Sequence, residues 1–156
     1  MTIAASVTGC YESLVPLDSA PQTDIDARVI GGWKRMFAEP DANRVFAMEV
    51  KPSGNRQYQA TTMVAGGDLG RYQLYASTLK GEPLVNVRSL QAEPGEKPWV
   101  FLRYEFLKPN VLHVRAIREA ALEGTQDSAA AMRKSLEQSK DDSEIFEDAF
   151  VCLRLK

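Results

Sequence analysis

The chain has 156 residues, of which 44% are hydrophobic and 26% are charged, and its formal net charge is -2. This composition is typical of a single soluble globular domain and excludes a disordered chain or a membrane-spanning helical protein. The Lys and Arg residues are scattered and not clustered, which argues against nucleic-acid binding. The two cysteines, Cys10 and Cys152, lack CxxC spacing, so the sequence indicates neither a zinc site nor a disulfide framework, and no cofactor is expected.

Residues 1–27 are expected to form a leader and tether before the folded domain. Val7-Thr8-Gly9-Cys10 has the form of a bacterial lipobox, although no basic segment and no full apolar core precede it. Cys10 is therefore a candidate lipidation site, which would anchor the protein to the bacterial envelope in the periplasm. If the tetrapeptide is coincidental, the protein is cytoplasmic. The segment 11–27 contains two prolines and four acidic residues, which predicts an extended tether in which Leu17 and Ile25 can dock.

Residues 28–156 are expected to form one β domain. The clearest signal is a hairpin, in which two segments that alternate between apolar and polar residues are joined by the turn Lys108-Pro109-Asn110. Similar segments recur at regular spacing between turns rich in Gly, Pro, Asn and Asp. They predict seven strands, at 29–37, 44–51, 57–65, 71–79, 84–91, 99–107 and 111–118.

The C-terminal part changes period. Apolar residues recur every three or four positions over 128–139, which predicts an amphipathic helix with Asp127 or Ser128 as its N-cap. A short helical turn at 144–146 and an eighth strand at 149–155 are expected to follow. A flat sheet would leave an apolar face and two edges open, so the fold class expected is mainly β, an eight-stranded antiparallel up-and-down barrel with one C-terminal helix before the last strand.

The alternation also predicts which face of the sheet is wet. The face opposite the apolar sets is rich in polar residues and is expected to lie in solvent: Gln57, Gln59, Arg71, Gln73, Asn86 and Arg88.

Gly31-Gly32-Trp33 gives a Gly-x-Trp at the start of the first strand, before an eight-stranded meander with a late helix. Over residues 29–156 this arrangement resembles the lipocalins and the wider calycin group, and in detail it looks most like small bacterial lipoproteins of lipocalin-like build. The resemblance implies that Gly31 and Trp33 close the bottom of the barrel. It also implies that a basic residue of the last strand packs across the Trp ring, with Arg154 the first candidate and Lys156 the second. The chain has neither a recognisable second lipocalin motif nor a cysteine pair at useful spacing.

The sequence carries no recognisable catalytic constellation. His113 is the single histidine, and it is expected to be a solvent-facing cross-strand partner of Glu105 or a neighbour. The glycine-rich stretch 66–70 joins two strands and reads as a hairpin turn, not as a phosphate loop. The basic residues Arg71, Arg88, Arg103 and Arg115 are expected to form a solvated face.

Two functions follow as hypotheses. The first is a non-enzymatic binding protein that holds a small apolar or amphipathic ligand in the mouth of the barrel, near Phe46, Met48, Tyr58, Tyr72 and Tyr104. The second is a solid barrel that contacts another envelope protein, which exposure of Val45, Leu90, Trp99 or Phe101 would favour. An enzyme is the third possibility, and the sequence does not predict the oligomeric state.

Overall fold

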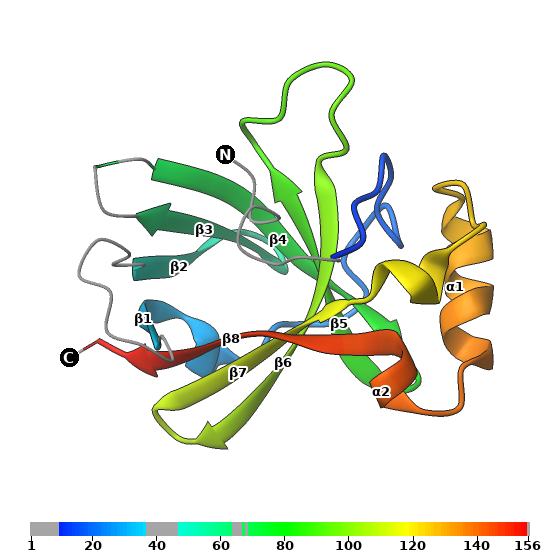
Figure 1. Cartoon of the computed structure of the whole chain (residues 1–156). Helices are drawn as coiled ribbons and strands as arrows, with labels where there is room; N and C mark the ends of the chain where they lie inside the picture. The colour runs from blue at the N-terminus through cyan, green and yellow to red at the C-terminus, as the bar shows by residue number, and fades with distance from the viewer. Residues whose placement is uncertain (1–9, 37–46, 64–66, 68, 156) are drawn as a thin grey trace.

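The computed structural model describes residues 10–36, 47–63, 67 and 69–155 (Figure 1). Eight antiparallel strands follow one another around a closed barrel, and β1 completes it by pairing with β8. This topology confirms the predicted fold class. The strands are β1 (Gly31–Met36), β2 (Ala47–Gly54), β3 (Gln57–Met63), β4 (Leu69–Leu79), β5 (Glu82–Ser89), β6 (Trp99–Lys108), β7 (Val111–Ile117) and β8 (Phe146–Arg154).

The helices lie mainly between β7 and β8. A short 3-10 helix η3 (Glu119–Leu122) precedes α1 (Ala129–Gln138), whose N-cap Ser128 accepts a hydrogen bond from the Ala131 amide at 3.3 Å. The predicted helix and its cap are thus confirmed. A single helical turn, α2 (Asp142–Ile145), leads directly into β8, which begins at Phe146 and not at 149 as expected. The strand starts earlier because Phe146 pairs with Ile117 at the end of β7.

The inner core fills the barrel with the side chains of one parity from each strand. These inward residues come from all eight strands and include Trp33, Val50, Tyr58, Tyr72, Val87, Leu102, Leu112 and Cys152. The period-two alternation that predicts this face is therefore a reliable guide to the inner core.

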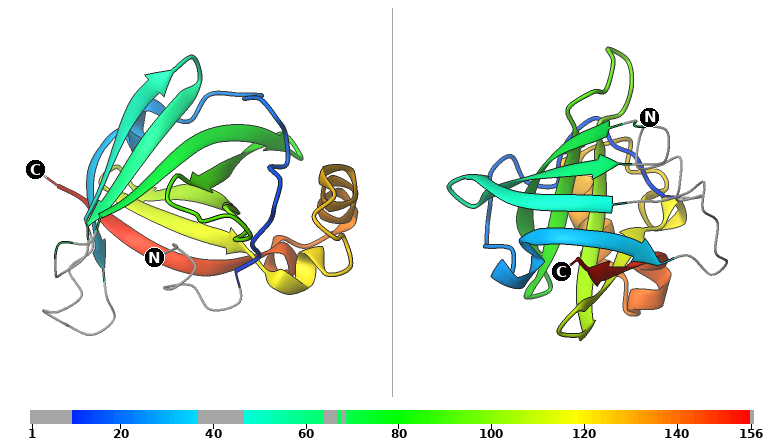
Figure 2. Two further views of the ribbon diagram at one scale, coloured as in Figure 1. Left: turned by 90° about the horizontal axis from the view of Figure 1, so that it is seen from above. Right: turned by 90° about the vertical axis from the view of Figure 1, so that its left-hand side faces the viewer.

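A second core lies on the outer face of the barrel, over β4, β5 and β6. It contains Tyr75, Leu84 and Phe101, which α1, η3 and the leader cover. Figure 2 shows the leader crossing the barrel and the helices standing outside it. Phe101 and Trp99 are thus buried inside the molecule and offer no outer contact surface. Leu90 is exposed, and Val45 lies outside the described residues.

The expectation that Asn86 faces solvent is wrong, because this residue is fully buried beneath the leader. Its amide nitrogen donates to the Ser77 hydroxyl at 2.8 Å, and its amide oxygen accepts from the Leu17 backbone at 2.9 Å. A buried amide is tolerated when its donors and acceptors are satisfied, as they are here. Asn86 therefore joins the leader to the sheet.

The described part of the expected tether, from Cys10 onward, is bound to the barrel at several points along its length. Ser13 exchanges backbone hydrogen bonds with Trp99, and the Gln22 amide donates to the Ala76 carbonyl at 2.8 Å. Leu17 and Ile25 are 4% and 3% exposed. Backbone pairing and apolar burial together offset the entropy lost on ordering this segment.

Candidate functional site

We call the end of the barrel at which β1 begins the base, and the opposite end the mouth. At the base, Trp33 is completely buried and its indole nitrogen donates to the Val29 carbonyl at 2.8 Å. The guanidinium carbon of Arg154 lies 4.4 Å from the centroid of the Trp33 ring, which is cation–π geometry. The structure thus brings together the tryptophan and the arginine that the family resemblance pairs.

Gly31 allows this contact to form. Its φ is +128°, a backbone conformation that favours glycine, and a Cβ at this position would lie 3.0 Å from a guanidinium nitrogen of Arg154. That guanidinium also donates to the carbonyls of Ile30 and Arg28. The three residues expected to close the barrel, Gly31, Trp33 and Arg154, therefore form one connected unit.

The leader continues across the base as a plug, residues 24–30, which includes the 3-10 helix η2 (Ala27–Val29). Ile25 enters the inner core from below, and two inward tyrosines hold the backbone of the plug. The Tyr104 hydroxyl accepts from the Asp26 amide at 2.9 Å, and the Tyr58 hydroxyl donates to the Ile25 carbonyl at 3.4 Å. Burial raises the pKa of Tyr104, so its hydroxyl stays protonated at neutral pH.

The predicted ligand-binding residues therefore divide between the two ends. Tyr58 and Tyr104 belong to the base, where their hydroxyls bind the plug. Tyr72 lies toward the mouth, Met48 is the second residue of β2 and lies directly opposite Trp33, and Phe46 is outside the described residues. Strand alternation predicts the face on which a residue lies but not its height along the barrel, which depends on the register of all eight strands.

Inward side chains near both ends of the barrel, such as Tyr104 and Phe106 at the base, are less buried than those in its middle. Met48 and Phe150 pack against the inner core yet remain partly exposed, whereas Val50 and Cys152, two positions further along their strands, are buried. Tyr72 is buried and its hydroxyl is hydrogen bonded to Thr62. The mouth therefore presents accessible apolar and aromatic surface above a packed interior.

A pocket of about 610 Å³ opens in the barrel wall near the base, where β5 and β6 separate. The two strands pair only over Val85–Arg88 and Trp99–Leu102, and the residues that follow on β6 line the pocket. Arg103 lies on its wall, with its guanidinium carbon 4.4 Å from the Phe146 ring centroid and one nitrogen 3.5 Å from both Glu82 and Asp142. Arg103 is thus paired through one nitrogen, whereas its Nε and Nη2 atoms are buried without a hydrogen-bond partner in the described part of the chain.

His113 lies at the edge of this opening. It is directly opposite Glu105 in the register, as expected, but its Nε2 atom lies 2.9 Å from a carboxylate oxygen of Asp148. The sequence does not predict the pairing of His113 with Asp148, because it depends on the bulge in β8 near Ala149, which determines the carboxylate that reaches the imidazole ring. Arg103 and Arg115 are also cross-strand neighbours, whereas Arg71 and Arg88 oppose other residues, so the predicted arginine face is discontinuous.

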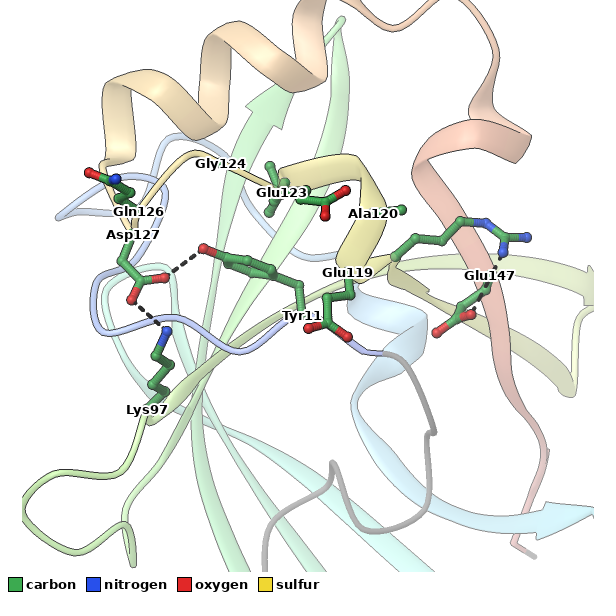
Figure 3. Close-up of a pocket in the computed structure, with 11 residues that line it drawn as sticks. Tyr11, Lys97, Glu119, Ala120, Glu123, Gly124, Gln126, Asp127 and Glu147 are labelled. Atoms are coloured by element: carbon green, nitrogen blue, oxygen red, sulfur yellow. Dashed lines mark hydrogen bonds and ion pairs between the residues drawn. The ribbon is translucent and has the colours of Figure 1, made fainter.

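A second pocket, of about 660 Å³, lies outside the barrel between the leader and the segment 118–127 (Figure 3). The Tyr11 hydroxyl donates to Asp127 at 2.6 Å, and the Lys97 ammonium lies 2.9 Å from the other carboxylate oxygen. Burial raises the pKa of Asp127, but the hydrogen bonds from Tyr11 and Lys97 outweigh it, so the net pKa is lowered. These contacts fasten the leader to the connection before α1.

Cys10 lies at the mouth, just past the end of β7. Its backbone forms a bridge with Arg118, and its half-buried side chain packs against the inner core. Burial, with the nearby carboxylates of Glu12 and Glu147, raises the pKa of the Cys10 thiol to about 12. The unmodified thiol is therefore protonated at neutral pH and a weak nucleophile.

Reasoning from the sequence did not identify the plug or the Tyr11–Asp127–Lys97 cluster. The signal for the plug was weak, since Ile25 is one apolar residue among prolines and acids. The cluster joins Tyr11 to Asp127, which is 116 positions away, and the sequence has no local pattern that indicates it.

Comparison of the chain with protein-family profiles, with curated proteins and with solved structures gives no significant match. In the described part of the chain, no helix is both long and apolar enough to cross a bilayer. Within the same residues, no three His, Cys, Asp or Glu side chains are grouped so that they could hold a metal ion.

Proposed function

We propose that this protein is a non-enzymatic, lipocalin-like envelope lipoprotein, anchored through Cys10, which binds a small apolar or amphipathic molecule at the barrel mouth. The observation that carries the binding role is the partial exposure of inward Met48 and Phe150 above a packed interior. Apolar and aromatic side chains that face inward and remain partly exposed are typical of ligand sites. The guanidinium of Arg35 lies 5.7 Å from the Phe150 ring centroid, so this surface combines an aromatic and a cationic group.

Envelope anchoring is supported by two features, the lipobox-like tetrapeptide before Tyr11 and the position of Cys10 at the edge of the folded domain. Mass spectrometry of the protein from its natural host tests this part of the proposal. A diacylglyceryl adduct on Cys10 supports it. An intact Met1 with a free Cys10 thiol would contradict it and favour a cytoplasmic protein.

Ligand binding is tested with two adjacent positions on β2 that face opposite sides of the barrel wall. Met48→Arg places a charge in the mouth, while Glu49→Arg changes an exposed outer position. We expect Met48→Arg to weaken binding of the apolar dye Nile red by about tenfold and Glu49→Arg to leave it unchanged. Equal dye binding by both variants would refute a site in the mouth, as would solvent extraction that releases no co-purified molecule.

The second candidate, a solid barrel that contacts another envelope protein, is favoured by one observation, the exposure of Leu90 on the outer face. Size measurement in solution, followed by cross-linking in the native envelope, distinguishes this role from ligand binding. A cross-linked protein partner that requires Leu90 would support it.

A further inference from the structure

Three exposed apolar side chains gather on the outer face of the barrel at the mouth. Met63, the last residue of β3, lies directly opposite Leu69, the first residue of β4. Leu90 directly follows the last residue of β5, and its amide donates to the Arg71 carbonyl at 2.9 Å. These residues, which we call the rim patch, are 52%, 46% and 49% exposed.

The rim patch and Cys10 belong to the same end of the molecule. In an up-and-down barrel, alternate strands finish at the same end, so the ends of β3, β5 and β7 all lie at the mouth. Cys10 bridges Arg118, one residue beyond β7, and its side chain packs against the inner core at that end. A lipid on Cys10 would therefore begin at the mouth and not at the base.

We infer that in the lipid-anchored form the barrel stands with its mouth toward the bilayer, and that the rim patch inserts at the boundary between headgroups and acyl chains. This inference rests on the lipidation proposed above. The two acyl chains of a diacylglyceryl group hold the protein at the membrane, and an additional apolar contact at the surface then fixes how the barrel stands on it. The anchor holds the rim patch within reach of the surface, which raises the effective concentration of that contact.

The charges around the rim patch are compatible with binding to lipid headgroups, but they do not provide most of the binding. Arg71 is exposed beside Leu69 and forms no ion pair with the described part of the chain, so it is free to contact anionic phosphates. Glu93 and Glu96 follow Leu90 in the next loop and oppose that attraction. Burial of Met63, Leu69 and Leu90 must therefore provide most of the binding.

This orientation has a consequence for ligand exchange. The partly exposed inward residues Met48 and Phe150 open at the end that would face the acyl chains. An apolar molecule could then pass between bilayer and barrel without crossing bulk water.

The test uses the chain with Cys10→Ser and Cys152→Ser, with a hexahistidine tag in place of residues 1–9. The tag binds vesicles of phosphatidylglycerol and phosphatidylethanolamine that contain a nickel-chelating lipid, so attachment does not depend on natural lipidation. A nitroxide label is placed through Leu90→Cys at the mouth, or through Leu107→Cys at the base, which is similarly exposed at 54%. Accessibility to a water-soluble relaxation agent is measured with and without vesicles.

We expect vesicles to lower the accessibility of the label at position 90 by about fivefold and to leave the label at 107 unchanged. Met63→Ser with Leu69→Ser should abolish the protection at position 90, whereas the matched pair Leu153→Ser with Leu155→Ser should preserve it. Equal accessibility at 90 with and without vesicles, or stronger protection at 107, would overturn the inference. Because the tag replaces the lipid, such a failure is distinct from a failure of Cys10 lipidation, which mass spectrometry reports.

Discussion

At the base, the missing side chain of Gly31 leaves room for the guanidinium of Arg154. Gly31 combines a positive φ with close approach to the Arg154 guanidinium, which itself covers Trp33. A Cβ at position 31 would destabilise the protein in two ways, by straining the backbone and by displacing the guanidinium of Arg154. Gly95 also has a positive φ, but no atom lies within 4 Å of where its Cβ would be.

We therefore expect Gly31→Ala to lower the free energy of unfolding by about 2–4 kcal/mol and Gly95→Ala by about 1 kcal/mol. Urea denaturation of both variants measures the difference, which isolates the loss of the arginine contact. Equal losses would show that the approach of Arg154 to Gly31 contributes nothing beyond backbone strain.

The buried carboxylate of Asp127 gives a prediction for pH dependence. Its pKa lies below the ordinary value of 3.8 in the folded protein, so its stabilising effect is present above pH 3.8 and is lost as the pH falls through the folded pKa. Asp127→Asn should cost about 1–2 kcal/mol at neutral pH. Asn also tolerates the positive φ of 57° at this position.

The difference in unfolding free energy between the wild type and Asp127→Asn should stay constant above pH 3.8 and shrink below it. Denaturation curves at several pH values test this expectation, with Glu96→Gln as the exposed control. A difference that persists in strong acid would mean that the charge of Asp127 is not what stabilises the leader.

At the scale of elements, the leader behaves as part of the fold. Ile25 fills the base of the barrel and is buried, whereas Leu14 in the same segment is 53% exposed. Ile25→Ala should therefore cost about 2–4 kcal/mol of unfolding free energy, and Leu14→Ala less than about 0.5 kcal/mol. Thermal unfolding of the two variants compares a plug residue with a bystander of similar size. A plug that only rests on the barrel would give equal, small effects.

The strands were predictable because each follows a local period of two, and α1 because its apolar residues follow the helical period. The second core could not be predicted from the sequence. Alternation assigns the residues of a strand to two faces, but it does not indicate whether other elements cover the outer face. Asn86 illustrates this limit: an amide suits both a wet face and a satisfied buried site, and only the position of Leu17 decides between them. The pairing of Trp33 with Arg154 came from the family resemblance and not from any local pattern.

At the scale of the whole molecule, the two hydrophobic cores lie on opposite faces of the barrel sheet, and the leader contributes residues to both. Trp33 lies in the inner core and Trp99 in the outer core. The leader contributes Leu17 to the outer core and Ile25 to the inner one, with the intervening backbone bonded to β4. A substitution that destabilises one core should therefore destabilise the other as well. This predicts a single cooperative unfolding transition.

The test uses Trp33→Phe, in which fluorescence reports only on Trp99, while far-ultraviolet circular dichroism reports mainly on the barrel strands. In urea the two signals should give coincident transitions. Adding Leu17→Ala, which opens a cavity only in the outer core, should lower both midpoints equally, with a loss of about 2–4 kcal/mol. A Trp99 transition that moves to lower urea alone would mean that the outer core unfolds independently and that the leader does not couple the two.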